Sequence, residues 1–210
     1  MFDALYRILP KERIKTRLID RYAYASDASH FYLVPQAVVQ PNTIEEIQKI
    51  FTFSHEYNIH ITFRAGGTSL SGQGITDGVL VDLSNYWRKV TPENNGERVR
   101  VQPSVIGAHV NMALKKYGRK IGPDPASINA CMMGGILSNN SSGMCCGVVH
   151  NSYHTLQYLT FILPNGQVFS TEKPEDYARF EDEAADIANG LRSLRREVLD
   201  NTALVEKIRK

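Results

Sequence analysis

The residues best suited to chemistry in this chain form one glycine-rich run at 64–74, which reads RAGGTSLSGQG. Glycines let the backbone adopt positive φ angles and approach a ligand closely, and successive N–H groups in such a turn can point into one concavity. Thr68, Ser69 and Ser71 add hydroxyl donors, and Arg64 is the only cation in the run. The run therefore predicts a cradle for an anion such as a diphosphate.

The residues on both sides of this run predict strands that position it. Ile59, Ile61 and Phe63 alternate with polar residues before it, and an apolar stretch at 79–83 follows it. A Walker loop is excluded because no lysine lies in or near the run, and a Rossmann fingerprint is excluded because its glycines would open a helix. A glycine-rich hairpin connection that binds no ligand is the alternative.

A second segment, 125–171, contains no Asp, Glu, Lys or Arg, although 22% of the chain is charged. Residues 123–127 (PDPAS) predict a rigid turn, Gly134-Gly135 predicts a close-packed backbone, and 138–143 (SNNSSG) is dense in hydrogen-bonding groups. Such a neutral wall suits a flat heterocycle with carbonyl and ring-nitrogen edges, because unpaired charge is costly to bury. A serine- and asparagine-rich loop without a ligand is the alternative.

Two smaller clusters contain residue types that could bind metal or react. His150 and His154 are four residues apart, as on one helix face, but no acidic residue lies near them and Asn151-Ser152 indicates a turn. We interpret the adjacent Cys145 and Cys146 as buried packing residues, because free cysteine usually behaves as a small apolar side chain. The sequence therefore predicts no metal site and no catalytic residue within this chain.

Composition narrows the class of protein further. The chain has 210 residues, 24 of them basic and 22 acidic, and the basic residues form no single stripe of the kind that binds nucleic acid. The three cysteines lack the spacing of a disulfide framework, which favours a reducing, cytoplasmic location. We expect no secretory signal, because residues 1–15 are charged and carry no long apolar core, and no apolar run reaches transmembrane length. Peripheral contact with the inner face of a membrane is left open.

The order of patterns predicts an α+β fold in two lobes. Residues 1–31 are predicted to be an N-terminal helical extension, with a solvated connection at 11–21. Lobe 1, about 32–92, has a capping box at Thr43 and Glu46 that begins an amphipathic helix. Lobe 2, about 96–175, has a helix that ends at Gly118 and a hairpin around 164–166. A helix with an apolar stripe is predicted within 176–210.

Taken together, these motifs resemble the FAD-binding domain of the vanillyl-alcohol oxidase or PCMH type, nearest to FAD-linked D-lactate and glycolate dehydrogenase-like proteins. Residues 64–72 resemble the family's pyrophosphate loop, 123–127 its second FAD segment, and Gly134-Gly135 with 139–143 its third. The resemblance covers about 32–171. It implies a two-lobed PCMH-type domain with FAD extended between the lobes.

The resemblance also implies the residues that bind the cofactor. These are Arg64, Ala65, Gly66, Gly67, Thr68, Ser69, Pro125, Ser127, Gly134, Gly135, Asn140, Ser142, Gly143 and Gly147. Some relatives tether flavin through a histidine directly after the two loop glycines, where this sequence has Thr68. The resemblance therefore implies non-covalent FAD.

In the relatives a substrate-binding cap follows the FAD domain. The resemblance therefore implies an FAD-binding fragment of a larger oxidoreductase, inactive alone, whose small 2-hydroxy acid is bound by a cap domain absent from this chain. Residues 148–152 (VVHNS) are similar to the longer relatives that carry iron–sulfur modules. Two alternatives stay open: a flavoenzyme fragment like UDP-N-acetylenolpyruvoylglucosamine reductase, and a non-catalytic two-lobed module that has lost flavin.

Overall fold

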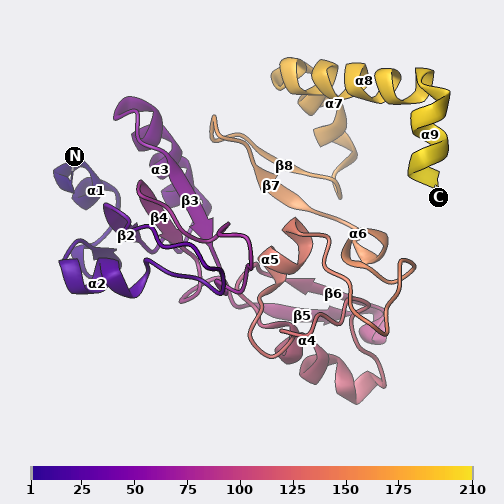
Figure 1. The fold of residues 1–210 in the computed structure, drawn as a ribbon, viewed down its shortest axis with the longest axis horizontal. Helices are drawn as coiled ribbons and strands as arrows, with labels where there is room; N and C mark the ends of the chain where they lie inside the picture. Colours follow the sequence, from indigo (N-terminus) through magenta and orange to yellow (C-terminus); the bar gives the residue numbers. More distant parts are fainter. Residues whose placement is uncertain (1, 210) are drawn as a thin grey trace. The chain divides into compact units, whose positions relative to one another are not determined.

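The computed structural model describes residues 2–209, which form a mixture of helices and short strands (Figure 1). The α+β class expected from the sequence is confirmed. The chain divides into two compact units. One comprises the residues up to Leu156 together with Pro164–Gly166, and the other comprises Gln157–Leu163 and the residues from Gln167 onward.

The first unit contains a four-stranded sheet with the order β1-β2-β4-β3. Its strands are β1 (Ile14–Lys15), β2 (Ala37–Val39), β3 (Ile61–Arg64) and β4 (Val79–Asp82). Strands β2, β4 and β3 are parallel, and β1 is antiparallel to β2. Because β3 and β4 are parallel, the loop 65–78 between them is a crossover, so the hairpin geometry of the alternative is wrong. The loop begins at the carboxyl end of β3, where ligands commonly bind to parallel sheets.

Helix α3 (Ile44–Glu56) begins where the capping box predicts. The Thr43 hydroxyl oxygen accepts a hydrogen bond from the Glu46 N–H at 3.2 Å, which satisfies a donor that the first helical turn leaves free. The helix buries Ile47, Ile50 and Phe53. Helix α1 (Phe2–Ile8) packs against α3, so the N-terminal residues contribute to the same core.

The segment that follows α1 corrects one expectation. It forms the short helix η1 (Lys11–Arg13), strand β1 and helix α2 (Leu18–Ala23). Arg13 is buried and donates two hydrogen bonds to the Glu46 carboxylate, at 2.7 and 2.5 Å. The prediction of a solvated connection at 11–21 is therefore wrong for its first half, because Glu46 supplies a partner from α3 that the local sequence does not reveal.

The rest of the first unit is built around a hairpin and the helices that follow it. Strands β5 (Val90–Glu93) and β6 (Arg98–Val101) pair antiparallel around the turn η2 (Asn94–Gly96). Helix α4 (Gly107–Leu114) continues into η3 (Lys115–Tyr117) and ends at Gly118 with φ 67°, as predicted. The Gly134-Gly135 region, predicted only as close-packed backbone, lies in helix α5 (Met133–Ser138). A short helix, α6 (Ser152–Thr155), follows. The buried core of this part consists of Val105, Val110, Leu114, Cys131, Met133 and Ile136.

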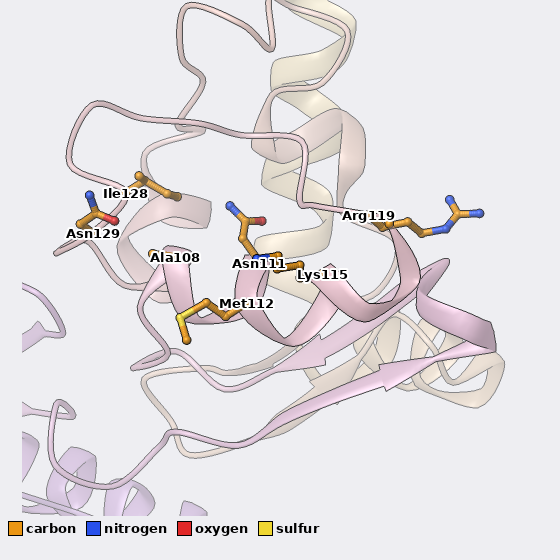
Figure 2. A pocket seen from close by; sticks show the side chains of 8 residues that line it. Ala108, Asn111, Met112, Lys115, Arg119, Ile128 and Asn129 are labelled. Carbon is orange, nitrogen blue, oxygen red and sulfur yellow. The ribbon is translucent and has the colours of Figure 1, made fainter.

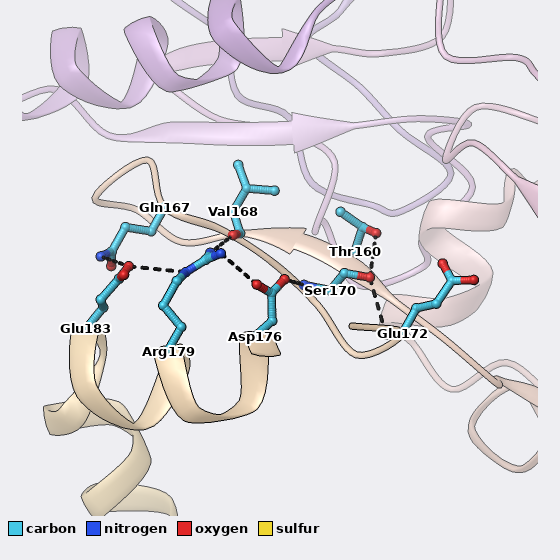
Figure 3. Close-up of polar contacts among 8 residues, drawn as sticks. All are labelled: Thr160, Gln167, Val168, Ser170, Glu172, Asp176, Arg179 and Glu183. Atoms are coloured by element: carbon cyan, nitrogen blue, oxygen red, sulfur yellow. Dashed lines mark hydrogen bonds and ion pairs between the residues drawn. The ribbon is translucent and has the colours of Figure 1, made fainter. Parts of the chain in front are cut away.

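The second unit is a hairpin followed by three helices. Its elements are β7 (Thr160–Ile162), β8 (Val168–Ser170), α7 (Pro174–Glu183), α8 (Ala185–Asp200) and α9 (Thr202–Arg209). Arg179 joins α7 to the hairpin, because its guanidinium donates to the Val168 carbonyl oxygen in β8 (Figure 3). Within α7 the same guanidinium donates to the Asp176 carboxylate at 2.6 Å and lies 3.4 Å from the Glu183 carboxylate. The predicted hairpin is confirmed, and the apolar stripe of α8 is exposed at Leu191 and Leu194.

No helix among the described residues is both long enough and apolar enough to cross a membrane.

Candidate functional site

The glycine-rich loop presents a row of free backbone donors. Among residues 2–209, no protein acceptor receives a hydrogen bond from the backbone N–H groups of Gly66, Gly67, Thr68 or Ser69. These residues are half-buried, so their N–H groups are partly shielded from water. A buried or half-buried N–H group without a partner is costly, and an anion at this position would satisfy several of them at once.

Arg64 lies beneath this loop and shapes it. Its guanidinium Nη1 donates to the carbonyl oxygens of Ser26 at 2.8 Å, Tyr24 at 3.3 Å and Gly74 at 3.5 Å. Gly67 covers the guanidinium with a φ of 62°, and a Cβ added at Gly67 would lie 2.5 Å from Arg64 Nη2. Glycine is therefore favoured at position 67 by its backbone angle, and a side chain there would also have to displace the Arg64 guanidinium from its carbonyl partners.

A buried polar cluster supports the floor of the loop at the end of β4. Asp82 is 1% exposed, and its Oδ2 accepts hydrogen bonds from the Tyr24 hydroxyl at 3.0 Å and from Gln40 Nε2 at 2.7 Å. Burial, followed by the negative charge of Asp82, raises the pKa of Tyr24 to about 12. Tyr24 therefore remains a neutral donor to Asp82 throughout the physiological pH range. The Arg64 guanidinium lies 5.7 Å from the centre of the Tyr24 ring.

The third predicted segment and the residues just before it contact the first. A Cβ added at Gly66 would lie 3.0 Å from the Ala130 carbonyl oxygen and 3.3 Å from the Met132 backbone nitrogen. Gln73 Nε2 also donates to Asn139 Oδ1 at 3.2 Å. The structure therefore brings the loop together with the residues on both sides of α5, where Gly134 and Gly135 lie. Gly134 is itself close-packed, because a Cβ added there would lie 2.9 Å from Pro103 Cβ, and its N–H donates to the Pro103 carbonyl at 2.8 Å.

The second predicted segment reaches this region through a turn. The Pro125 carbonyl accepts from the Ile128 N–H at 2.9 Å, and the Ser127 carbonyl accepts from the Cys131 N–H at 2.8 Å. Immediately before the turn, Asp124 Oδ2 accepts from the Cys145 N–H at 3.2 Å. Gly143 packs on Asp124 so closely that any Cβ there would collide with the Asp124 backbone. The turn at 125–127 is therefore tied to 143–145.

Among residues 2–209, no hydrogen bond links Asn140, Ser142 or Gly147 to the loop. Asn140 adopts a φ of 47°, and its Oδ1 accepts from the Tyr153 N–H at 2.9 Å, so it holds α6 in place. Ser142 is exposed, and Gly147, with a φ of 53°, is exposed with no atom near an added Cβ.

The two histidines do not lie together on one helix. His150 lies outside α6, so it does not share a helix face with His154, whose Nδ1 lies 2.7 Å from the Val148 carbonyl oxygen. No group of three His, Cys, Asp or Glu side chains among residues 2–209 could hold a metal ion. Cys146 is buried as interpreted, but Cys145 is exposed and that part of the interpretation is wrong.

A surface pocket of about 380 Å³ lies elsewhere in the first unit, along α4 and η3 (Figure 2). Its lining residues are Ala108, Asn111, Met112, Lys115, Gly118, Arg119, Ile128 and Asn129. In Figure 2 the Arg119 side chain points away from the other lining side chains. None of the predicted cofactor residues lines this pocket.

Sequence reasoning missed the residues that support the loop from below. The residues next to Tyr24, Gln40 and Asp82 in the sequence form no motif. The one sequence feature that could have indicated a role is the position of Asp82 at the end of an apolar strand that follows the glycine loop. Gln40 and Tyr24 lie 42 and 58 residues before Asp82, so their meeting depends on the folded sheet, which no local pattern encodes.

Comparison with known proteins gives the family. A model of the FAD binding domain family matches residues 35–172. D-2-hydroxyglutarate dehydrogenase from Haemophilus influenzae is 32% identical over 162 residues, which is 75% of this chain and 16% of that protein. Glycolate oxidase subunit GlcD from Bacillus subtilis is 32% identical over 145 residues, which is 68% of this chain and 31% of that protein. The chain therefore spans less than a third of the length of either relative.

The fold is also found in solved structures. An alkyldihydroxyacetonephosphate synthase superposes with a TM-score of 0.70 at 20% identity, covering 85% of this chain and 39% of that one. 6-Hydroxy-D-nicotine oxidase from Arthrobacter nicotinovorans superposes with a TM-score of 0.63 at 18% identity, covering 72% of this chain and 33% of that one. At these identities the likeness supports the fold alone.

Proposed function

The chain belongs to the FAD binding domain family, and from this premise we propose that it binds FAD without a covalent bond, with the diphosphate seated in the loop 64–74. The observation that carries the proposal is the row of free N–H groups from Gly66 to Ser69 at the carboxyl end of β3. A diphosphate offers many acceptor oxygens to these N–H groups. It carries no hydrogen-bond donors, which the N–H groups would repel.

The charge around the loop fits a diphosphate. Arg64 places a positive charge beneath the N–H groups while its guanidinium Nη1 is held by backbone carbonyls. An anion above the loop would therefore be attracted without having to displace the arginine from its partners. The hydroxyl group of Thr68 adds a further donor at the edge of the same row.

A non-covalent flavin follows from the residue types at the site. Thr68 offers no ring nitrogen for a covalent bond, and Cys131 is 5% exposed within the core of the first unit. We propose that the neutral segment 125–147 faces the isoalloxazine ring, since it can offer hydrogen bonds without burying charge.

For the whole protein we propose an FAD-linked oxidoreductase that acts on a small 2-hydroxy acid. Two relatives whose names refer to hydroxy acids, D-2-hydroxyglutarate dehydrogenase and the GlcD subunit of glycolate oxidase, support this substrate class. Bound FAD would supply the hydride acceptor. We propose that the hydroxy acid is held by residues outside this chain, because 125–171 contains no Arg or Lys to bind a carboxylate.

The proposed domain boundaries follow from this reading. The FAD-binding domain is proposed to span 32–175 in two lobes, with β1 added to it because this strand pairs with β2. Residues 176–210 are proposed to lead to the substrate-binding cap, and the similarity of 148–152 to longer relatives supports an iron–sulfur module in the full-length protein.

Three free cysteines support a cytoplasmic location.

The proposal is tested by reconstitution. We expect the purified chain, incubated with FAD and passed through a desalting column, to retain a flavin absorbance spectrum in a one-to-one ratio with protein. Precipitation with trichloroacetic acid should then release all of the yellow colour into the supernatant. A chain that retains no flavin would contradict the proposed function, and colour that stays in the pellet would contradict its non-covalent character.

A further inference from the structure

A short N-terminal segment, residues 24–28, contacts the glycine-rich loop at both of its ends. The Ala28 N–H donates to the Gly67 carbonyl oxygen at 3.1 Å, and Asp27 Oδ2 accepts from the Gly74 N–H at 3.3 Å. The Ser26 carbonyl receives the Arg64 guanidinium at 2.8 Å. These contacts span about forty residues of sequence, so the segment lies across the loop as a strap.

Asp27 uses both of its carboxylate oxygens in this strap. Oδ1 accepts from the Ser29 N–H at 2.8 Å, and Oδ2 accepts from the Gly74 N–H. Burial alone would raise the pKa of Asp27, but the hydrogen bonds from Ser29 and Gly74 and the nearby charge of Arg64 outweigh burial and lower this pKa. Asp27 is therefore ionised at neutral pH, and Arg64 offsets its negative charge next to the proposed anion site.

The strap determines where one loop N–H group points. In a trans peptide unit, the C=O of one residue and the N–H of the next lie in one plane and point in opposite directions. Because the Gly67 carbonyl oxygen is held by Ala28, the N–H of Thr68 must point away from the strap. This is one of the N–H groups that donate to no acceptor within residues 2–209.

We propose that residues 24–28 form a strap that positions the glycine-rich loop for the FAD diphosphate, with Asp27 as its positioning residue. This inference rests on the proposed FAD site. The strap lies before residue 35, where the match to the family begins, so the functional cofactor site extends upstream of the recognised domain. Phe31 continues the contact, since a Cβ added at Gly72 would lie 2.8 Å from its ring.

Replacement of Asp27 in the full chain tests the strap. Asp27→Ala removes both acceptor oxygens, and we expect it to weaken FAD binding at least tenfold at a temperature where circular dichroism shows the variant folded. Asp27→Asn keeps one acceptor oxygen and should recover part of the affinity. Asp20→Ala is the matched control, because Asp20 lies in α2 and pairs with the exposed Arg17. This control should bind FAD as the parent does.

Two further measurements separate the outcomes. Hydrogen exchange of the peptide that covers 65–74, measured without FAD, should be faster in Asp27→Ala than in the parent and Asp20→Ala. The ³¹P resonances of bound FAD should shift in Asp27→Asn.

A parent chain that binds no FAD contradicts the proposed function. If the parent binds FAD and the affinity of Asp27→Ala for FAD lies within twofold of the parent's affinity, the strap is overturned. If Asp27→Ala does not fold, Asp27→Asn decides the question. An Asp27→Asn variant that binds FAD with the affinity of the parent and gives the same ³¹P resonances as the parent overturns the strap.

Discussion

Gly67 and Gly118 share a left-handed backbone, with φ angles of 62° and 67°, but differ in their surroundings. A Cβ at Gly67 would meet the Arg64 guanidinium, whereas a Cβ at Gly118 would have no neighbour within 4 Å. We therefore expect Gly67→Ala to weaken FAD binding more than tenfold. Gly118→Ala has the same unfavourable backbone angle, so it should lower the free energy of unfolding by about 1 kcal/mol and leave FAD binding unchanged. Titration of both variants with FAD checks the prediction, and equal affinities would contradict it.

Arg64 shows how far single residues can be interpreted from sequence. Its place at the start of the loop and its positive charge are evident from the sequence, and both matter to the proposed site. Its direction is not evident, because the carbonyl groups of Tyr24 and Ser26 that hold it belong to a segment about forty residues earlier. The glycine at position 67 is explained only once this arginine is known to lie beneath it.

At the scale of elements, the ion pair between Arg13 and Glu46 joins the N-terminal segment to α3. The side chains are 11% and 15% exposed. Burial would raise the pKa of Glu46, but the hydrogen bond from Arg13 and those from the backbone of Asn42 and Thr43 lower it. A carboxyl group whose pKa is lowered by folding contributes stability above its unfolded pKa, and this contribution is lost as the pH falls through the folded pKa.

We therefore expect Glu46→Gln to lower the free energy of unfolding by about 2 kcal/mol at pH 7, and this difference from the parent to shrink below about pH 4.3. Trp87 is the single tryptophan, and its indole N–H donates to the Pro41 carbonyl at 2.8 Å, so its fluorescence reports unfolding close to α3. Asp20→Asn, on the exposed Arg17 pair, should leave stability nearly unchanged. A Glu46→Gln effect that does not depend on pH would contradict this account.

Elements with strong local signals were predicted well, and those that depend on distant pairing were not. The start of α3 at Thr43 and the end of the α4–η3 helix at Gly118 follow from capping rules that act within one turn. Strand β1 has only two residues, so it carries no usable periodicity, and its place in the sheet comes from pairing with β2. The parallel pairing of β3 with β4 is likewise set by the whole sheet.

At the scale of the whole molecule, the chain spans only 16% of one relative and 31% of another, and this limits the activity expected of it alone. Oxidation of a hydroxy acid needs a base near its hydroxyl and a cation that holds its carboxylate. The neutral segment 125–171 contains no Arg or Lys that could hold the carboxylate, and His150 and His154 are its only candidate bases. Anaerobic mixing of the FAD-loaded chain with D-lactate, glycolate or 2-hydroxyglutarate should therefore not bleach the flavin. Rapid stoichiometric bleaching would show that catalytic groups lie within this chain.

The central claim is that the free N–H groups of the loop receive the diphosphate of FAD, and it is tested most directly by nuclear magnetic resonance of the chain labelled with ¹⁵N-glycine. The amide signals of Gly66 and Gly67 should move on addition of FAD, because their N–H groups gain acceptors, and the same two signals should move with ADP, which has a diphosphate but no flavin. Gly118 and Gly190, outside the proposed site, serve as internal controls and should not move. FAD that binds while the Gly66 and Gly67 signals stay fixed would contradict the claim.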